Sequence, residues 1–356
     1  GASSEAGTSD RLNAAAACLP FQWDGNAAAL EMHTGGEPVR IITSGYPNIQ
    51  GTSILEKRRY VLEHLDHLRR LLLLEPRGHA DMYGVIPVEP DAPGADLAVL
   101  FMHNEGYSTM CGHAVIALGR YAVDQGIVEI GEPETKVSIQ CPCGVVIAHV
   151  TTCDGQPRKV RFQSVPAFAF VLDKEIATSQ YGPINIDIGY GGAFYAVVPA
   201  EHFGLDVRAS PTCDLVQAAT IVSNAVKEQV PLYHPSNPDL AFLYGSILTD
   251  GRDEFSSIPS ANICVFANQQ VDRSPTGSGV TARIAIQHHR HLIGMNEVRA
   301  FESITGALFT GSAIRKTTCG EFKGVIVEVA GEAHYSGECV LSLEETDKIG
   351  AGFLLS

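Results

Sequence analysis

The sequence predicts an α+β fold in which two pseudo-symmetric β-rich domains are each wrapped around a central helix. The first observation is that two sequence patterns occur twice in the same order, with the second copy a similar distance downstream each time. The second observation is the content of 35 glycines and 19 prolines, which is typical of sheet-rich proteins with many tight turns. A duplicated β-rich unit explains both observations.

The first repeated pattern carries a Gly-Gly pair between an acidic residue and two β-branched residues. It spans Glu31–Ile42 and returns at Asp187–Val198. The second pattern lies where a loop leads into an expected helix, at Met110–Leu118, and returns at Pro275–Arg283. Two echoes in one order favour duplication over coincidence.

We therefore predict a domain boundary near residue 185. The N-terminal domain covers residues 28–185 and carries the helix that follows Cys111. The C-terminal domain covers residues 186–356 and carries the helix that follows Thr276, and its last strands are candidates to return to the N-terminal domain. Residues 1–27 are expected to form a disordered N-terminus.

Local patterns agree with this architecture. Short β-branched runs bounded by turn residues predict strands at Val145–Val150, Ile184–Ile188, Ala261–Phe266 and Gly324–Val329. Apolar residues at near-helical spacing predict the two central helices at Gly112–Asp124 and Gly277–His289. A further amphipathic helix is predicted over Ile54–Leu74, with its Arg and His side chains in solvent.

Composition excludes several classes of function. A net charge of −15 argues against a nucleic-acid partner, which needs clustered Lys and Arg. No apolar run approaches the roughly 20 residues that span a bilayer, so we expect no membrane partner and a cytoplasmic location. Nine scattered cysteines do not form a secreted disulfide framework. No nucleotide-binding glycine motif occurs, and Cys141 and Cys143 lack a second ligand pair, so we expect no cofactor and no metal.

Cys111 stands where the first central helix begins. The partial positive charge and unpaired N–H groups of a helix N-terminus stabilise a thiolate and can also hold a carboxylate. Gly112 lets a ligand approach the backbone closely because it has no side chain. An amino acid whose carboxylate binds there would have its α-carbon near the Cys111 sulfur. A buried small thiol without chemistry is the competing interpretation.

The second helix start offers a hydroxyl in place of the thiol, because Thr276 takes the position of Cys111 in the repeat. If the repeats pack about a pseudo-two-fold axis, both helix N-termini point at one cleft between the domains. Asp272 can accept a hydrogen bond from a substrate nitrogen, and His113 could hold the same nitrogen. Alternatively, Asp272 is a turn-stabilising residue.

Three segments resemble the signatures of the proline racemase superfamily: Met32–Pro38, Met110–His113 and Asp272–Gly279. The resemblance runs from about residue 30 to the C-terminus. It implies a diaminopimelate-epimerase-like fold, an active site in the interdomain cleft, a homodimer and no cofactor. It also implies that Cys111 is the catalytic base, that Gly112, His113, Gly277 and Ser278 bind the substrate carboxylate, and that Asp272 and His113 flank the ring nitrogen.

Thr276 departs from the racemases and epimerases of this family, which carry a second cysteine there. A threonine resembles the family's dehydratases, which act on trans-3-hydroxy-L-proline, and so implies a hydro-lyase that forms Δ1-pyrroline-2-carboxylate. Racemisation without a cofactor needs a proton-transfer group on each face of the carbon, whereas dehydration needs only one for the α-proton. The acid that assists the departing hydroxide stays open among Cys111, His113 and water.

Two alternatives remain at the level of sequence. The first is a proline racemase or hydroxyproline 2-epimerase, which Thr276 disfavours. The second is a non-catalytic amino-acid binding protein on the same scaffold, which would keep the glycines but gain nothing from a thiol at the helix start.

Overall fold

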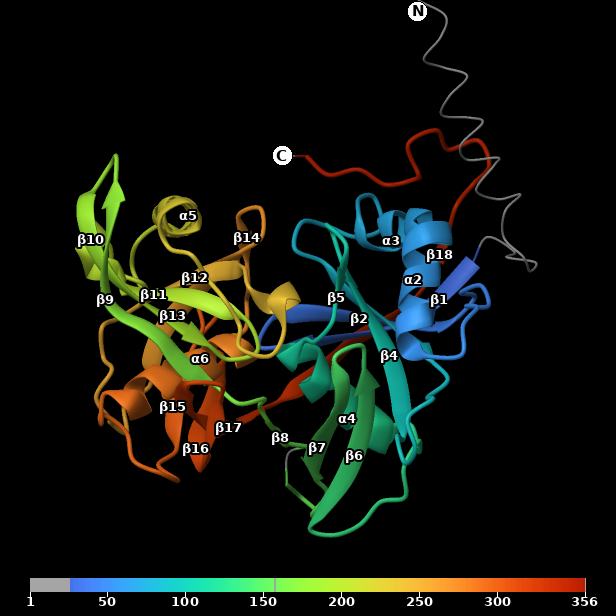
Figure 1. Ribbon diagram of the computed structural model, residues 1–356. Coiled ribbons are helices and arrows are strands. Elements are labelled where there is room, and N and C mark those ends of the chain that lie inside the picture. The colour runs from blue at the N-terminus through green and yellow to red at the C-terminus, as the bar shows by residue number, and fades with distance from the viewer. Residues whose placement is uncertain (1–25, 157, 356) are drawn as a thin grey trace, which may run out of the picture.

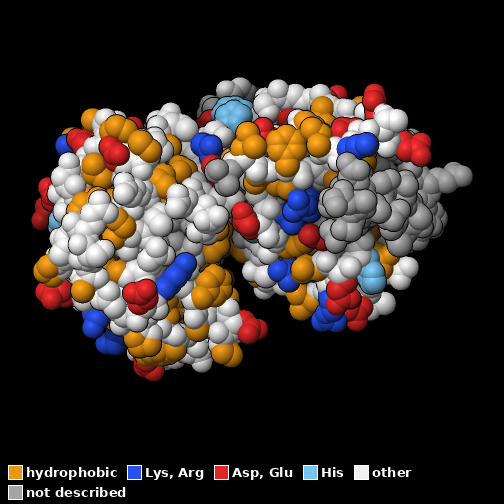
Figure 2. Space-filling view, turned by 90° about the horizontal axis from the view of Figure 1, so that it is seen from above, with side chains coloured by type: hydrophobic (Ala, Val, Ile, Leu, Met, Phe, Trp, Pro, Cys, Tyr) orange, Lys and Arg blue, Asp and Glu red, His pale blue; other side chains and the backbone are white. Residues whose placement is uncertain are grey.

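The computed structural model describes residues 26–156 and 158–355 and consists of two β-rich lobes, each with one helix inside it (Figure 1). In Figure 1 the blue to green elements form one lobe and the yellow-green to orange elements form the other, while the red strand β18 returns to the first lobe. A space-filling view from above shows that the surface is hollowed between the two lobes (Figure 2).

The first repeat contains seven strands around helix α4. In chain order its elements, with the two outer helices, are β1 (Asn26–Thr34), β2 (Glu37–Ser44), α2 (Ile54–His64), α3 (Asp66–Leu73), β3 (Tyr83–Val88), β4 (Leu97–His103), β5 (Tyr107–Ser108), α4 (Gly112–Asp124), β6 (Glu134–Cys141) and β7 (Gly144–Thr151). Strands β8 (Val160–Gln163) and β9 (Phe168–Thr178) follow. The predicted helix over Gly112–Asp124 is confirmed.

The second repeat has the same order of elements around helix α6. They are β10 (Gly182–Tyr190), β11 (Phe194–Pro199), η1 (Ala200–Phe203), α5 (Thr212–Gln229), η2 (Pro238–Leu240), β12 (Leu243–Thr249), β13 (Ser260–Phe266), β14 (Gln270–Val271), α6 (Gly277–His289), β15 (Arg299–Glu302) and β16 (Leu308–Cys319). The chain ends with β17 (Phe322–Gly331) and β18 (Ala333–Ser342). The second predicted central helix and all four predicted strands are confirmed.

Strand pairing repeats with the elements, which confirms the duplication read from the sequence. The hairpin β1–β2 is antiparallel, β2–β3 is parallel, β3–β4 and β4–β5 are antiparallel, and β4–β6 is parallel. The same succession recurs in β10–β11, β11–β12, β12–β13, β13–β14 and β13–β15. The Gly-Gly pairs of the first sequence pattern therefore occupy corresponding hairpin turns, and the second pattern starts corresponding helices.

The end of the chain pairs with its beginning. Strand β18 runs antiparallel to β1, and β17 pairs with both β16 and β8, so that strands link the two repeats. Strand β10 crosses residue 185, and the division into domains at that residue stays a prediction. Residues 1–25 of the expected disordered N-terminus lie outside the described residues. Asn26 and Ala27, which that prediction included, instead belong to β1.

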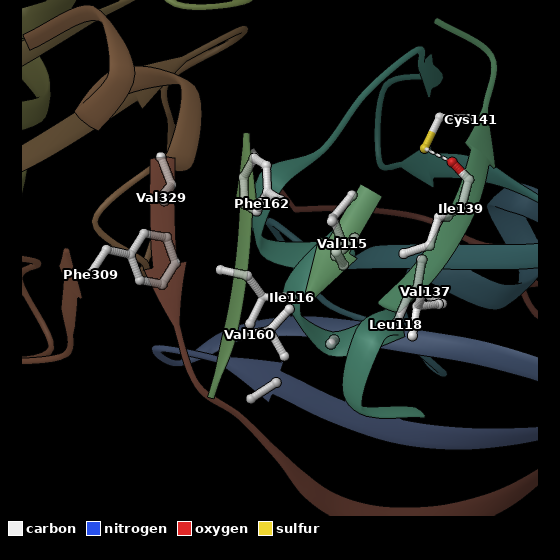
Figure 3. Close-up of a cluster of buried hydrophobic side chains, with 14 of the residues drawn as sticks. Val115, Ile116, Leu118, Val137, Ile139, Cys141, Val160, Phe162, Phe309 and Val329 are labelled. Atoms are coloured by element: carbon white, nitrogen blue, oxygen red, sulfur yellow. Dashed lines mark hydrogen bonds between the residues drawn. The ribbon is translucent and has the colours of Figure 1, made fainter. Parts of the chain in front are cut away.

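The central helices are buried because apolar residues face strands on several sides. Val115, Ile116 and Leu118 of α4 are fully buried and meet the side chains of β6 and β8 (Figure 3). Phe309 and Val329 extend the same core from the second repeat. This packing fixes where α4 begins, and hence where Cys111 lies.

The helix predicted over Ile54–Leu74 is instead two helices, α2 and α3, which meet at Leu65. Leu65 leaves the helical conformation with φ −124° and ψ 12°. The change of direction lets Arg69 donate to the carbonyl of His103 over 3.1 Å, while Asp66 pairs with its guanidinium at 2.7 Å. The prediction that the Arg and His side chains lie in solvent is wrong for Arg69, which is buried.

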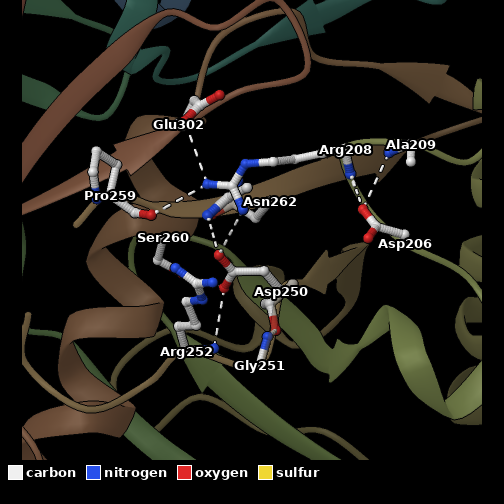
Figure 4. A network of polar contacts seen from close by, with 12 residues as sticks. Asp206, Arg208, Ala209, Asp250, Gly251, Arg252, Pro259, Ser260, Asn262 and Glu302 are labelled. Atoms are coloured by element: carbon white, nitrogen blue, oxygen red, sulfur yellow. Dashed lines mark hydrogen bonds and ion pairs between the residues drawn. The ribbon is translucent and has the colours of Figure 1, made fainter.

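Ion pairs and hydrogen bonds of two arginines connect strands and loops of the second repeat. Arg208 forms an ion pair with Asp250 at 3.2 Å and donates to the carbonyl of Pro259 over 3.3 Å (Figure 4). Nearer to α6, the fully buried Arg283 donates to Asn262 over 3.0 Å, and Asn262 donates to the carbonyl of Pro275 over 3.3 Å. The Arg283 contacts therefore hold the loop that leads into Thr276.

None of the helices within residues 26–156 and 158–355 is long and apolar enough to cross a membrane.

The contact between Gly191 and helix α6 gives a stability prediction. A Cβ atom at Gly191 would lie 2.2 Å from the carbonyl oxygen of Ser278 and 2.5 Å from the amide nitrogen of Ala282. Gly191→Ala should lower the free energy of unfolding by about 1–3 kcal/mol or more, because the hairpin must move away from the helix. Urea denaturation measures this. Gly106→Ala is the control, since a Cβ there meets no atom within 4 Å, and equal stability of the two variants would contradict the prediction.

Candidate active site

The N-termini of α4 and α6 meet directly. A Cβ atom at Gly112 would lie 3.3 Å from Cα of Gly277, and one at Gly277 would lie 3.4 Å from Cα of Gly112. Phe162 closes one side, because its ring tip would lie 3.3 Å and 3.5 Å from the same two Cβ positions. Glycine at both positions allows this close approach of two backbones. The residues before them, Cys111 and Thr276, therefore flank one junction.

The first amide groups of each helix are available at this junction. The N–H groups in the first turn of a helix have no intrahelical acceptor. They belong to Gly112 and His113 in α4 and to Gly277 and Ser278 in α6. The hydroxyl of Ser278 lies 2.6 Å from that of Tyr195, which fixes its side chain beside the second helix start. The two helix starts lie side by side, and the binding of a carboxylate by these four residues stays a prediction.

Cys111 is the N-cap residue of α4 and is partly exposed. Its sulfur lies 2.9 Å from Nδ1 of His113. The Tyr83 hydroxyl and the Ala114 N–H also form hydrogen bonds with the sulfur. Tyr83 packs edge-on against the His113 ring at a centroid distance of 4.8 Å and holds the hydroxyl of Ser108 at 2.8 Å. The thiol is thus oriented by groups from α4 and β3.

The charge state of Cys111 differs from the expectation of a stabilised thiolate. Burial is the main cause that raises the pKa of the thiol to about 12, and the charge of Asp272, with that of Glu37 when it is ionised, contributes in the same direction. The hydrogen bonds from Tyr83 and the Ala114 N–H lower the pKa but do not offset burial. The helix start therefore acts in the expected direction, and burial outweighs it because water is withdrawn from the sulfur.

His113 is buried beneath the junction. Its Nε2 lies 3.4 Å from the carbonyl oxygen of Pro38, and its own carbonyl accepts a hydrogen bond from the Thr34 hydroxyl over 2.8 Å. Burial lowers the pKa of the imidazole, and Asp272 partly opposes this. His113 is therefore neutral, with both ring nitrogens close to partners.

Asp272 and Thr276 lie together in the loop that precedes α6. The hydroxyl of Thr276 donates to Oδ2 of Asp272 over 2.9 Å, while Oδ1 accepts the N–H of Ser274 over 2.8 Å. Both side chains are buried. The turn-stabilising role considered for Asp272 is present, and its proximity to Cys111 and His113 leaves room for a second role.

Thr276 has a strained backbone, with φ +70° and ψ 102°. A positive φ is a rare conformation for a β-branched residue, and such strain persists only where the surroundings enforce it. The Ser274 hydroxyl accepts the Thr276 N–H over 3.1 Å, and Asn262 holds the carbonyl of Pro275. These contacts turn the Thr276 side chain toward Asp272.

Glu37 is a site residue to which the sequence assigned no role. It begins β2 after the Gly35-Gly36 turn and is only 2% exposed, and its Oε2 accepts the N–H of Arg273 over 2.7 Å. Burial raises the pKa of its carboxyl well above the usual range, and the charge of Asp272 adds to this, while Arg273 opposes it. The signal was its place inside the Met32–Pro38 signature.

The β1–β2 turn also ties the two repeats together. Thr305 donates to the carbonyl of Gly35 over 2.8 Å, and the Arg273 guanidinium forms an ion pair with Asp81. Asp81 in turn is held by Asn104, whose Oδ1 accepts the Asp81 N–H over 2.6 Å. The site is consequently assembled from both repeats.

Comparison with known proteins shows the family to which this chain belongs. Residues 29–354 match the family described as proline racemase, and the chain belongs to that family. A trans-L-3-hydroxyproline dehydratase of Xenopus tropicalis is 57% identical over 92% of this chain and 95% of its own length. A trans-3-hydroxy-L-proline dehydratase of Homo sapiens is 55% identical over 92% of this chain and 94% of its own length.

A solved structure has the same fold. A hydroxyproline epimerase from Agrobacterium vitis, with trans-4-hydroxy-L-proline bound, superposes with a TM-score of 0.83 at 27% identity, covering 94% of this chain and 97% of that chain. The predicted α+β fold and the family resemblance are confirmed.

The raised pKa of Cys111 predicts how the thiol reacts without substrate. Iodoacetamide reacts with the thiolate, whose fraction rises about tenfold per pH unit below the pKa. The rate of labelling at Cys111 should therefore keep rising from pH 7 to pH 10, because the pKa is about 12. Mass spectrometry of the peptide that contains Cys111 measures this rate. A plateau below pH 9 would contradict the prediction.

Proposed function

We propose that this protein is a cofactor-independent hydro-lyase that dehydrates trans-3-hydroxy-L-proline to Δ1-pyrroline-2-carboxylate, with Cys111 removing the C2 proton. The observation that carries the proposal is the meeting of two helix N-termini with a thiol on one and a hydroxyl on the other. The dehydratase names of the two animal relatives support it.

The substrate carboxylate binds at the paired helix starts. The free N–H groups of Gly112 and His113 face the same junction as those of Gly277 and Ser278, and two helix dipoles converge there. These donors also stabilise the negative charge that grows on the C2 substituents as the proton leaves, an effect often worth about 3 kcal/mol per donor. Binding and activation thus use one set of groups.

The substrate nitrogen binds between Asp272 and His113. Asp272 brings a negative charge next to Cys111, which disfavours a thiolate in the free enzyme. A cationic substrate nitrogen compensates that charge, so its arrival lowers the pKa of the thiol. Cys111 therefore becomes a competent base when the correct zwitterion is bound.

Only one face of the ring has a proton-transfer group suited to C2. A threonine hydroxyl is far too weak an acid to ionise at neutral pH, so it cannot take a proton from C2. The hydroxyl of Thr276 moreover donates to Asp272. In trans-3-hydroxy-L-proline the C2 hydrogen and the hydroxyl share the face opposite the carboxylate. Removing the proton on that face and expelling the hydroxyl gives an enamine, which tautomerises to the cyclic imine.

Replacing the base should stop turnover. Cys111→Ser should reduce the dehydration rate by several orders of magnitude with an unchanged fold, because a serine hydroxyl is a much poorer base at neutral pH. Imine formation, followed with an aldehyde reagent, measures the rate, and circular dichroism checks the fold. Cys213→Ser, at an exposed thiol in α5, is the control. A Cys111→Ser enzyme that kept most of its activity would end the proposal.

Placing a thiol on the second face should add an isomerase activity. Thr276→Cys restores the pair of cysteines, so proline should exchange its C2 hydrogen with solvent deuterium and racemise slowly. Proton NMR in deuterium oxide and chiral chromatography measure the two events. Absence of any deuterium at C2 in a folded Thr276→Cys variant would show that the two-face argument is wrong.

The rival function is racemisation of proline or epimerisation of a hydroxyproline. The nature of the product separates it from dehydration, since the rival yields a chiral amino acid and the proposed reaction yields an imine. We also propose that the protein is a homodimer, which the resemblance to the family supports. A cytoplasmic location is proposed because the sequence has no apolar run long enough to span a bilayer.

A further inference from the structure

Glu37 is the one carboxyl group at the junction with an oxygen that accepts no hydrogen bond from the described residues. Its Oε2 is held by the Arg273 N–H, whereas no partner within residues 26–156 and 158–355 reaches Oε1. Arg273, which holds Oε2, directly follows Asp272, and the carbonyl of Pro38, the residue after Glu37, lies 3.4 Å from Nε2 of His113. Glu37 therefore lies beside the two residues, Asp272 and His113, that the proposed function places around the substrate nitrogen.

We propose that Glu37 is a second catalytic residue, which gives its proton to the C3 hydroxyl as that group leaves. This inference rests on the proposed dehydration. It assigns the two proton transfers to different side chains, with Cys111 taking the C2 proton and Glu37 protonating the oxygen.

Burial supports a protonated Glu37 in the resting enzyme. The carboxyl is 2% exposed and shares the junction with the carboxylate of Asp272. Two like charges in a poorly hydrated site oppose each other, and one of them is relieved by holding a proton. Asp272 accepts two hydrogen bonds that stabilise its charge, so Glu37 is the carboxyl that keeps the proton.

The other groups at the junction are less suited to act as this acid. His113 has Nδ1 beside the Cys111 sulfur and Nε2 beside the Pro38 carbonyl, and its pKa is lowered. Thr276 already donates its hydroxyl proton to Asp272. Cys111 itself is the remaining rival, because it carries the proton taken from C2.

The proposed step balances without a co-reactant. The Cys111 thiolate takes the C2 proton, and the electrons of that C–H bond form the C2–C3 double bond. The C3–O bond breaks, and the oxygen takes the proton of Glu37 and leaves as water. Cys111 then returns its proton to solvent and Glu37 regains one, while the enamine becomes the imine.

A change of leaving group tests the proposal. Glu37→Gln keeps a neutral side chain of the same shape, whose oxygen can still accept the Arg273 N–H. With trans-3-hydroxy-L-proline the variant should lose about 10²–10⁴-fold in kcat, the range of a general acid. With trans-3-fluoro-L-proline its rate should stay close to that of the wild-type enzyme, because fluoride leaves without a proton. Imine formation and fluoride release are the readouts.

The control is Glu31→Gln on the same hairpin. Glu31 pairs with Arg40 at 2.6 Å and accepts a hydrogen bond from the Cys339 thiol over 3.2 Å, so both substrates should react as with the wild-type enzyme. Equal losses on both substrates in Glu37→Gln would mean that Glu37 only maintains the site, and no loss on either would leave Cys111 as the acid. Either result overturns the inference. A wild-type enzyme that forms no imine from the hydroxy substrate would instead refute the proposed function.

Discussion

The contact between Gly112 and Gly277 is the constraint on which the site depends. It brings together the N-termini of two helices, each of which carries roughly half a positive charge. Two such ends repel each other unless negative groups lie between or beside them. Asp272 brings a negative charge to the junction from the loop before α6, and an anionic substrate carboxylate adds a second. The fold thus creates a region of positive potential at the two helix N-termini, and a substrate carboxylate is stabilised there.

The same contact explains why the repeats are fastened so firmly near the site. The β1–β2 turn crosses to Thr305 and Arg273, Arg273 reaches back to Asp81, and β17 pairs with β8 behind the junction. A shift of the repeats by even a fraction of an ångström would separate the two sets of amide donors. Preorganised donors stabilise a developing charge because they need no reorientation during the reaction. The bridging contacts maintain that preorganisation.

Features that follow from the sequence repeats and from apolar periodicity could be predicted from the sequence. Features that depend on tertiary contacts could not. The starts of α4 and α6 follow from apolar spacing and the duplicated pattern, and they place Cys111 and Thr276 correctly. The break at Leu65 does not follow, because Arg69 finds its acceptors only once the loop after β4 is in place. Nor do the positive φ of Thr276 or the buried carboxyl of Glu37, which depend on neighbours distant in sequence.

The Cys111 environment shows why a helix start alone is a poor guide to thiol reactivity. The donors from Tyr83 and Ala114 stabilise the thiolate, yet burial and the nearby carboxylate of Asp272 favour the thiol. A permanently ionised cysteine would attract metals and oxidants, whereas a thiol that ionises beside a bound cation is reactive only with substrate present. The substrate nitrogen compensates Asp272, and a Glu37 that stays neutral adds no further negative charge. The balance of charge at the junction therefore links recognition of the amino acid to the chemistry at its α-carbon.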